Sequence, residues 1–315
     1  MNRGKYATLL DADLWAYIDR VDAWYPPEII AAPIGRQREV YDAMAAAFRQ
    51  EHPAGVETQD LAVAAGDRAV PIRRYRKGGT APMALVVYFH GGGFVLGGLE
   101  SHDDVCAELC AATGFEIVSV DYRLAPEHRH PAAFDDAMAA FAHIAAATDL
   151  PLVLCGESAG GNLAAAVAHA SRRGPRQASG QVLIYPSLGG DHETGSYAEH
   201  ANGPLLSVGD LRFYRDLRAG AGYAADDPTL EPLRDSDFSR LPPTFVITAQ
   251  CDPLSSDGDT YCRRIAAAGG RALWLEEPRL VHSFLRARTT VPRAQAAFDR
   301  IISAVAALGR LDWPF

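Results

Sequence analysis

The stretch Gly156-Glu157-Ser158-Ala159-Gly160 follows the short apolar run 151–155 and precedes an alanine-rich run at 159–170. The first run is typical of a short buried strand, and the second of a helix that packs closely on a sheet. The sequence therefore predicts a strand, a sharp turn and a helix, with Ser158 at the turn. Glycine is expected at both ends of the turn because larger side chains would collide with the neighbouring strand and helix.

Gly-x-Ser-x-Gly at such a junction is typical of a nucleophile elbow, in which a strained turn exposes the serine hydroxyl for attack on a carbonyl carbon. Matches of this length also arise by chance in a chain with 28 glycines, so an ordinary turn serine remains the alternative at this point. The surrounding sequence has to decide between the two interpretations.

The bulk composition limits the classes of protein to be considered. The 315 residues, 48% of them hydrophobic, are long for one ordinary domain and short for two, so we expect one domain with a cap. The net charge of −9 disfavours nucleic acid as a partner, because phosphate binding needs concentrated Lys and Arg. The densest basic run, 73–77, is interpreted as a solvated strand end.

The cysteines and the N-terminal sequence indicate the cellular compartment in which the protein is expected. Five cysteines without a secretory signal favour free thiols in a reducing environment. Cys106 and Cys110 are predicted to pack in the core, because a metal site would need a second pair or a histidine cluster. We find no apolar signal region and no apolar run long enough to span a membrane. We therefore expect a cytoplasmic protein.

Strands and helices are predicted to alternate along most of the chain. Strands are expected at 59–64, 69–75, 84–89, 115–121, 151–155, 180–185, 243–249 and 271–276, and helices at 102–113, 133–147, 159–172, 255–268 and 293–308. From the third strand on, this alternation predicts an α/β fold with a mostly parallel eight-stranded sheet and helices on both faces.

Two segments stand outside this alternation. Residues 1–55 have a helical pattern, whereas 187–240 are rich in Gly, Pro, Asp and Arg and carry no strand signal. We predict that both form a helical cap over a catalytic domain made of 56–186 and 241–315. The aromatic residues of the N-terminal segment either line a substrate pocket or only pack the cap on the body, and the sequence leaves both open.

A serine nucleophile needs a base that removes its proton and a carboxylate that orients the base. In α/β-hydrolases the acid and then the histidine follow the serine along the chain. Asp252 directly follows the predicted strand 243–249, and His282 follows the last strand. The other histidines after Ser158 lie in the helix after the turn or in the cap (His169, His192 and His200). Asp257 and Asp259 begin a helix, where capping is the ordinary role.

A glycine-rich stretch, His90-Gly91-Gly92-Gly93-Phe94, follows the predicted strand 84–89. Glycines let backbone N–H groups approach the oxygen on which negative charge develops during acyl transfer. The stretch matches the H-G-G-G motif of esterases and lipases. A phosphate loop is disfavoured because neither Gly-Lys-Ser/Thr nor a spaced Gly-x-Gly-x-x-Gly is present.

Together these stretches resemble the hormone-sensitive lipase family of α/β-hydrolases, the bacterial family IV esterases. The shared motifs lie in order between residues 90 and 284: 90–93, 121–128, 156–161, 252–254 and 282–284, with 228–243 also similar. The resemblance implies an α/β-hydrolase fold and a carboxylesterase. Such an enzyme hydrolyses short-chain alkyl or aryl esters through an acyl-enzyme, without a metal or organic cofactor.

The resemblance also implies roles for individual residues. Ser158 would be the nucleophile, His282 the base and Asp252 the acid. Gly92, Gly93 and Ala159 would donate the oxyanion-hole N–H groups, and His90, Gly91 and Glu157 would support the site. His90 is expected to orient the glycine loop rather than to take protons, and the segment 122–128 to buttress the site.

Three residues depart from the family pattern: Glu157 where Asp is usual, Ser256 where a second Asp follows the acid, and Ser283 where Gly follows the histidine. None removes a member of the triad. An amidase or deacetylase with the same triad remains an alternative, as does a hydrolase-fold receptor without turnover, which the intact triad disfavours. The expected partners are a small-molecule ester and, as is common in the family, a second copy in a homodimer.

Overall fold

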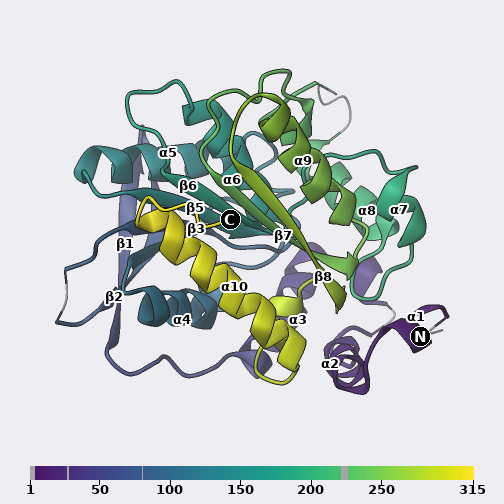
Figure 1. Ribbon diagram of the computed structural model, residues 1–315. Helices are drawn as coiled ribbons and strands as arrows, with labels where there is room; N and C mark the ends of the chain where they lie inside the picture. Colours follow the sequence, from purple (N-terminus) through teal and green to yellow (C-terminus); the bar gives the residue numbers. More distant parts are fainter. Residues whose placement is uncertain (1–3, 27, 80, 221–225) are drawn as a thin grey trace.

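One eight-stranded sheet forms the centre of the molecule, with the strands in the order β1-β2-β4-β3-β5-β6-β7-β8. Figure 1 shows the computed structural model, which describes residues 4–26, 28–79, 81–220 and 226–315. The strands are β1 (Val56–Ala65), β2 (Arg68–Lys77), β3 (Leu85–Phe89), β4 (Glu116–Val120), β5 (Leu152–Glu157), β6 (Gly180–Ile184), β7 (Thr244–Cys251) and β8 (Ala272–Val281). β2 pairs antiparallel with β1 and β4, and every other neighbouring pair is parallel. The predicted fold class is therefore confirmed.

Helices cover both faces of the sheet. They are α4 (Asp103–Thr113) and α10 (Pro292–Gly309) on one face, and α5 (Ala132–Ala147), α6 (Ala159–Ser171) and α9 (Ser255–Ala267) on the other. Strands β3 to β6 are buried along their whole length, which explains their continuous apolar runs. A separate hydrophobic cluster lies on each side of the sheet.

The last strand is longer than the sequence predicted. β8 continues to Val281, beyond the predicted end at residue 276. Pro278 has no N–H to donate to a neighbouring strand, so the sequence does not predict that the strand continues through it. A β-bulge allows the strand to continue past this residue. Arg279 has φ +58°, and Val281 pairs again with Cys251 after a register shift. The extension carries the chain to the residue before His282.

The described parts of the two predicted cap segments contain helices joined by loops and no strand. The first contains α1 (Tyr6–Leu9), α2 (Ala12–Asp22), η1 (Ile29–Ala31) and α3 (Ile34–Phe48), and the second α7 (Gly195–Glu199), α8 (Val208–Ala219) and η3 (Pro232–Arg234). Residues 1–3, 27 and 221–225 of these segments lie outside the described residues. No helix formed by the described residues has the length and apolar character needed to cross a bilayer.

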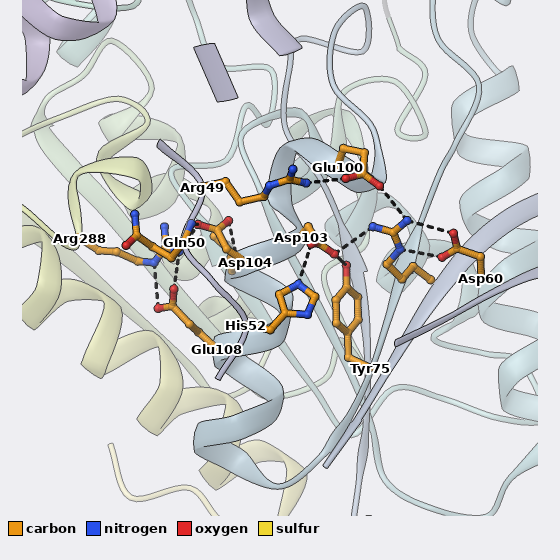
Figure 2. A network of polar contacts seen from close by, with 12 residues as sticks. Arg49, Gln50, His52, Asp60, Tyr75, Glu100, Asp103, Asp104, Glu108 and Arg288 are labelled. Atoms are coloured by element: carbon orange, nitrogen blue, oxygen red, sulfur yellow. Dashed lines mark hydrogen bonds and ion pairs between the residues drawn. The ribbon is translucent and has the colours of Figure 1, made fainter. Parts of the chain in front are cut away.

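A polar network ties the end of the N-terminal segment to the start of α4 (Figure 2). His52 Nε2 lies 2.6 Å from Asp103 Oδ2. The backbone N–H of Gln50 donates to Asp104 over 3.1 Å. Both aspartates begin α4, where the free N–H groups of a helix favour negative charge. The chain is thus fixed just before it enters the sheet.

The same network corrects the interpretation of the start of the basic run 73–77, whereas Arg76 and Lys77 at its end are exposed as predicted. Arg73 was expected to be solvated, but only 14% of its side chain is exposed. It pairs with Asp60 over 2.6 Å and with Asp103 over 3.0 Å. Tyr75 in the same run is fully buried and donates to Asp103. Acidic partners that lie far away in the sequence give no local signal in the basic run itself.

The turn between β5 and α6 lies against the backbone at the end of β3. A Cβ atom at Gly160 would lie 2.6 Å from the carbonyl oxygen of His90 and would also overlap that of Phe89. Gly156 faces the same backbone and that of Gly160. Only glycine permits this approach, as the sequence predicted.

We expect Gly160→Ala to lower the free energy of unfolding by about 1–3 kcal/mol, because the new methyl group forces β3 and α6 apart. Urea unfolding followed by circular dichroism measures the change. Gly35→Ala is the matched control, since a Cβ there meets nothing within 4 Å. It should instead stabilise the protein by about 0.4–1 kcal/mol. Equal stability of the two variants would contradict the packing argument.

Candidate active site

Ser158 lies at the turn between β5 and α6 in a conformation that few L-residues adopt. Its φ is +55° and its ψ is −117°. The turn is held because the Ser158 N–H donates to the carbonyl of Ile184 over 2.9 Å. The half-buried side chain lines a cavity of about 460 Å³. Strain of this kind, held by the surrounding structure, is typical of functional sites.

A continuous chain of hydrogen bonds runs from Ser158 to Asp252. His282 Nδ1 lies 2.7 Å from Asp252 Oδ2, and His282 Nε2 lies 2.9 Å from Ser158 Oγ. With Nδ1–H donating to the carboxylate, Nε2 is free to accept the serine proton. Asp252 directly follows β7 and is fully buried, and His282 directly follows β8. The structure thus brings together three residues that lie far apart in the sequence.

The surroundings of His282 set its protonation. Burial alone lowers the pKa of His282, but the charge and the hydrogen bond of Asp252, together with the charge of Glu157, raise it above its ordinary value. Negative charge on both neighbours therefore favours the imidazolium that forms when the ring accepts a proton. This matches the task of a base that must hold a proton briefly.

The glycine loop after β3 lies at the same cavity. Gly92 and Gly93 have φ +117° and +62°, and both line the cavity beside Ser158 and Ala159. A Cβ at Gly92 would overlap the backbone of Leu96. Ala159 is the first residue of α6, so its N–H has no partner within the helix. The three residues predicted to supply N–H donors thus line the same cavity as Ser158.

Glu157 supports both the glycine loop and the base. Its buried carboxylate pairs with His102 Nε2 over 2.8 Å and fills the space that a Cβ on Gly91 would need. Burial alone raises the pKa of Glu157, but His102 and, to a smaller extent, His282 and the Tyr185 hydroxyl lower it to about 2. The Tyr185 ring in turn packs edge-on against His282 at 4.7 Å. The sequence gives no signal for His102 and Tyr185, because neither belongs to a motif.

His90 has the surroundings of a structural residue. It is fully buried, its ring stacks on Tyr122 at 4.2 Å, and its Nδ1–H donates to the carbonyl of Gly91. Burial, with the charge of His102 as a smaller cause, lowers the pKa of His90 to about 3. The ring therefore stays neutral near pH 7 and holds the backbone of the glycine loop.

The other two departures from the family pattern also have visible contacts. Ser283 adopts φ +62°, a conformation that glycine reaches more easily, and its carbonyl accepts from the Tyr17 hydroxyl over 3.0 Å. Ser256 and Ser196 exchange two hydrogen bonds of 2.7 and 2.8 Å between backbone and side chain. This pair joins the start of α9, just after Asp252, to α7.

The segment 122–128 contacts both the body and the N-terminal segment. Arg123 forms a two-pronged pair with Asp136 of α5, at 2.8 and 3.0 Å. Glu127 pairs with Arg38 of α3 over 2.7 Å. These contacts agree with a buttressing role.

Both predicted cap segments line the cavity. Aromatic side chains of the N-terminal segment (Tyr17, Tyr25, Tyr41 and Phe48) and Tyr214 of α8 belong to its walls. Tyr17 and Phe48 are also buried in a hydrophobic core cluster, so these side chains line the cavity as well as packing the segment on the body, rather than only packing it. Within the described part of the chain, no group of three or more His, Cys, Asp or Glu side chains could hold a metal ion.

Comparison with known proteins gives consistent matches. Residues 86–286 match a family described as alpha/beta hydrolase fold. The chain is similar to the carboxylic ester hydrolase LipN of Mycobacterium tuberculosis, at 35% identity over 80% of this chain and 70% of the relative. It is 29% identical to an ethyl acetate hydrolase of Pseudomonas putida over 94% of this chain and 98% of the relative.

A solved structure agrees with these relatives. The hyperthermophilic esterase of the archaeon Pyrobaculum calidifontis superposes with a TM-score of 0.89 at 30% sequence identity. The match covers 95% of this chain and 99% of that one.

We expect Glu157→Gln to lower the pKa of His282, because the variant removes one of the two negative charges that favour the imidazolium. Titration of the His282 ring by NMR measures the change. Glu193→Gln is the matched control, because Glu193 is exposed and pairs with Arg212 away from the base. An unchanged His282 pKa in Glu157→Gln would show that the carboxylate does not act on the base.

Proposed function

The chain belongs to the hormone-sensitive lipase family of α/β-hydrolases and is a carboxylic ester hydrolase, and on this premise we propose that Ser158, His282 and Asp252 form its catalytic triad. The hydrogen-bond chain of 2.9 and 2.7 Å through His282 is the observation that carries the proposal. The substrates are short-chain alkyl or aryl esters, in agreement with the ethyl acetate hydrolase among the relatives.

In the first half of the reaction, His282 Nε2 takes the proton of Ser158 as Oγ attacks the ester carbonyl. Asp252 holds the ring in the tautomer with Nδ1–H and stabilises its positive charge. The imidazolium then gives its proton to the leaving alcohol oxygen, and an acyl-enzyme remains on Oγ. In the second half, His282 takes a proton from water, the resulting nucleophile attacks the acyl carbon, and Ser158 regains its proton as the acid leaves.

The backbone stabilises the charge that forms on the carbonyl oxygen. We assign this role to the N–H groups of Gly92, Gly93 and Ala159, with His90, Gly91 and Glu157 as supporting residues. One such donor typically lowers the activation free energy by about 2.7–4 kcal/mol. Because the N–H of Ala159 is also the first of α6, the helix dipole adds to the stabilisation.

Three further features belong to the proposal. Residues 1–55 and 187–240 form the cap that shapes the pocket over a catalytic domain of 56–186 and 241–315. The protein is cytoplasmic. It forms a homodimer, which size-exclusion chromatography with light scattering tests directly.

We expect Ser158→Ala to abolish turnover of p-nitrophenyl acetate while leaving the fold intact, because the variant lacks the hydroxyl that forms the acyl-enzyme. Release of p-nitrophenol measures turnover, and circular dichroism checks the fold. The matching anilide, p-nitroacetanilide, should react far more slowly with the unmodified enzyme. Full activity of Ser158→Ala would contradict the mechanism, and comparable rates on the anilide would indicate an amidase.

We expect kcat/KM to fall on the acid side with an apparent pKa above 6.5, the ordinary value for histidine. The sign follows from the base: it acts only when neutral, and its raised pKa moves the loss of activity to higher pH. A pH–rate profile between pH 4 and 9 measures this. A profile that stays flat down to pH 4 would contradict the role of His282.

A further inference from the structure

One guanidinium group, that of Arg286, lines the catalytic pocket without a carboxylate at contact distance. Arg286 belongs to η4 (Phe284–Ala287), just after the base, and lines the same cavity as Ser158. Its Nη1 donates to the carbonyl of Ser101 over 3.1 Å, and its Nη2 donates to the Tyr41 hydroxyl over 3.0 Å. Among the described residues, no Asp or Glu oxygen lies within 4.0 Å of this group.

Most carboxylates of the pocket have partners of their own. Glu157 pairs with His102, Asp104 with Arg288 over 2.6 Å, Glu231 with Arg234 over 3.0 Å, and Asp210 accepts from the N–H of Ser207 over 2.8 Å. Asp22 of α2 is the remaining pocket carboxylate, and in the part of the chain that the structure describes it has no cation at contact distance. The acidic side chains near the base are therefore already engaged.

A second arginine of the pocket also has only neutral partners. Arg218 of α8 is buried, its charge lies 3.4 Å from the Phe94 ring centre, and its Nη atoms donate to the Leu230 carbonyl and to Asn162. Burial has the larger effect and lowers the pKa of Arg218, whereas the negative charges of Glu231 and Asp227 raise it without contacting the group. Two positive charges thus face the cavity with no carboxylate in contact.

The charge of Arg286 persists although the group is sheltered from water. Burial lowers the pKa of Arg286, but Tyr41, Tyr17 and Glu157 together raise it well above its usual range. A guanidinium carries five N–H donors, of which the two bonds described use two. A sheltered charge without a carboxylate in contact is costly, so a negative group that enters the pocket gains a charge interaction and hydrogen bonds with Arg286.

We propose that the preferred substrate of this esterase carries a carboxylate that binds to Arg286. Two classes of ester present this chemistry: half-esters of dicarboxylic acids, with the charge on the acyl side, and esters of hydroxy acids, with the charge on the alcohol side. The proposal rests on the ester hydrolysis proposed above and adds the chemical class of the ester.

A purely structural role for Arg286 gives a different result. If Arg286 only joins η4 to α3 and to the Ser101 carbonyl, its loss disturbs the pocket and slows all esters alike. If it binds a carboxylate, its loss slows charged esters and spares neutral esters of the same shape. The ratio of kcat/KM for a charged ester to that for its neutral isostere separates the two roles.

The experiment measures this ratio in two pairs of substrates by titration of the released acid at pH 7.5. Monoethyl succinate is compared with ethyl 4-methylpentanoate, in which an isopropyl group replaces the carboxylate on the acyl side. O-acetylglycolate is compared with isobutyl acetate, which makes the same replacement on the alcohol side. The unmodified enzyme is measured beside Arg286→Met, Arg286→Gln and Arg286→Lys.

We expect Arg286→Met and Arg286→Gln to lower the ratio about 10- to 100-fold in one of the two pairs, as the loss of a charged hydrogen bond predicts. The pair that responds identifies the side that carries the charge. Arg286→Lys should keep a large part of the ratio because it keeps the charge. Arg286→Gln keeps an N–H donor for Ser101 or Tyr41, so it provides a neutral variant with a conserved contact if Arg286→Met fails to fold.

Tyr41→Phe is the matched control, since it removes one hydrogen bond of Arg286 without removing the charge. Its ratio of kcat/KM for the charged ester to that for the neutral isostere should stay within about threefold of the ratio for the unmodified enzyme. Ratios that do not change in either pair for Arg286→Met and Arg286→Gln would overturn the inference. A larger loss in Tyr41→Phe than in Arg286→Gln would do the same. If the unmodified enzyme hydrolyses none of the four esters, the proposed ester hydrolysis itself fails, which is a separate outcome.

Discussion

The close backbone contact between Gly160 and the end of β3 is the constraint on which the rest of the site depends. It places the start of α6 against the carbonyls of Phe89 and His90, so the glycine loop after β3 and the turn that holds Ser158 lie side by side. The parallel sheet then brings the ends of β7 and β8, with Asp252 and His282, to the same edge. The geometry of the site is therefore a consequence of strand order and of two glycines.

Buried charge organises the remainder of the site. Asp252 and Glu157 are both buried and both act on His282, one through a hydrogen bond and one through its charge. Such carboxylates are tolerated only because each has a partner, His282 for the first and His102 for the second. Arg286 and Arg218 of the pocket differ, because their hydrogen-bond partners among the described residues are neutral. The paired carboxylates therefore act on His282, whereas the arginines with neutral partners are available to bind a substrate, as proposed above for Arg286.

The sequence predicted the sheet because its central strands are continuous apolar runs. It predicted Ser158 from the Gly-x-Ser-x-Gly pattern, and Asp252 and His282 from their order after Ser158, their positions after predicted strands and the family resemblance. The end of β8 was missed because Pro278 interrupts the pattern and a bulge restores the pairing. Arg73 was placed wrongly in solvent, and His102, Tyr185 and Arg286 were not found, because their contacts join residues that lie far apart in the chain. The catalytic roles are still predictions, although the structure brings the residues together.

The hydrogen bond from Tyr17 to the carbonyl of Ser283 links one wall of the pocket to the loop that follows the catalytic base. Tyr17 belongs to α2, which also forms a wall of the pocket, while Ser283 is the residue after the base. The backbone beside His282 is thus tied directly to a helix that borders the substrate space. One contact therefore couples the shape of the pocket wall to the position of the base, so a substitution in α2 can alter catalysis without touching the triad.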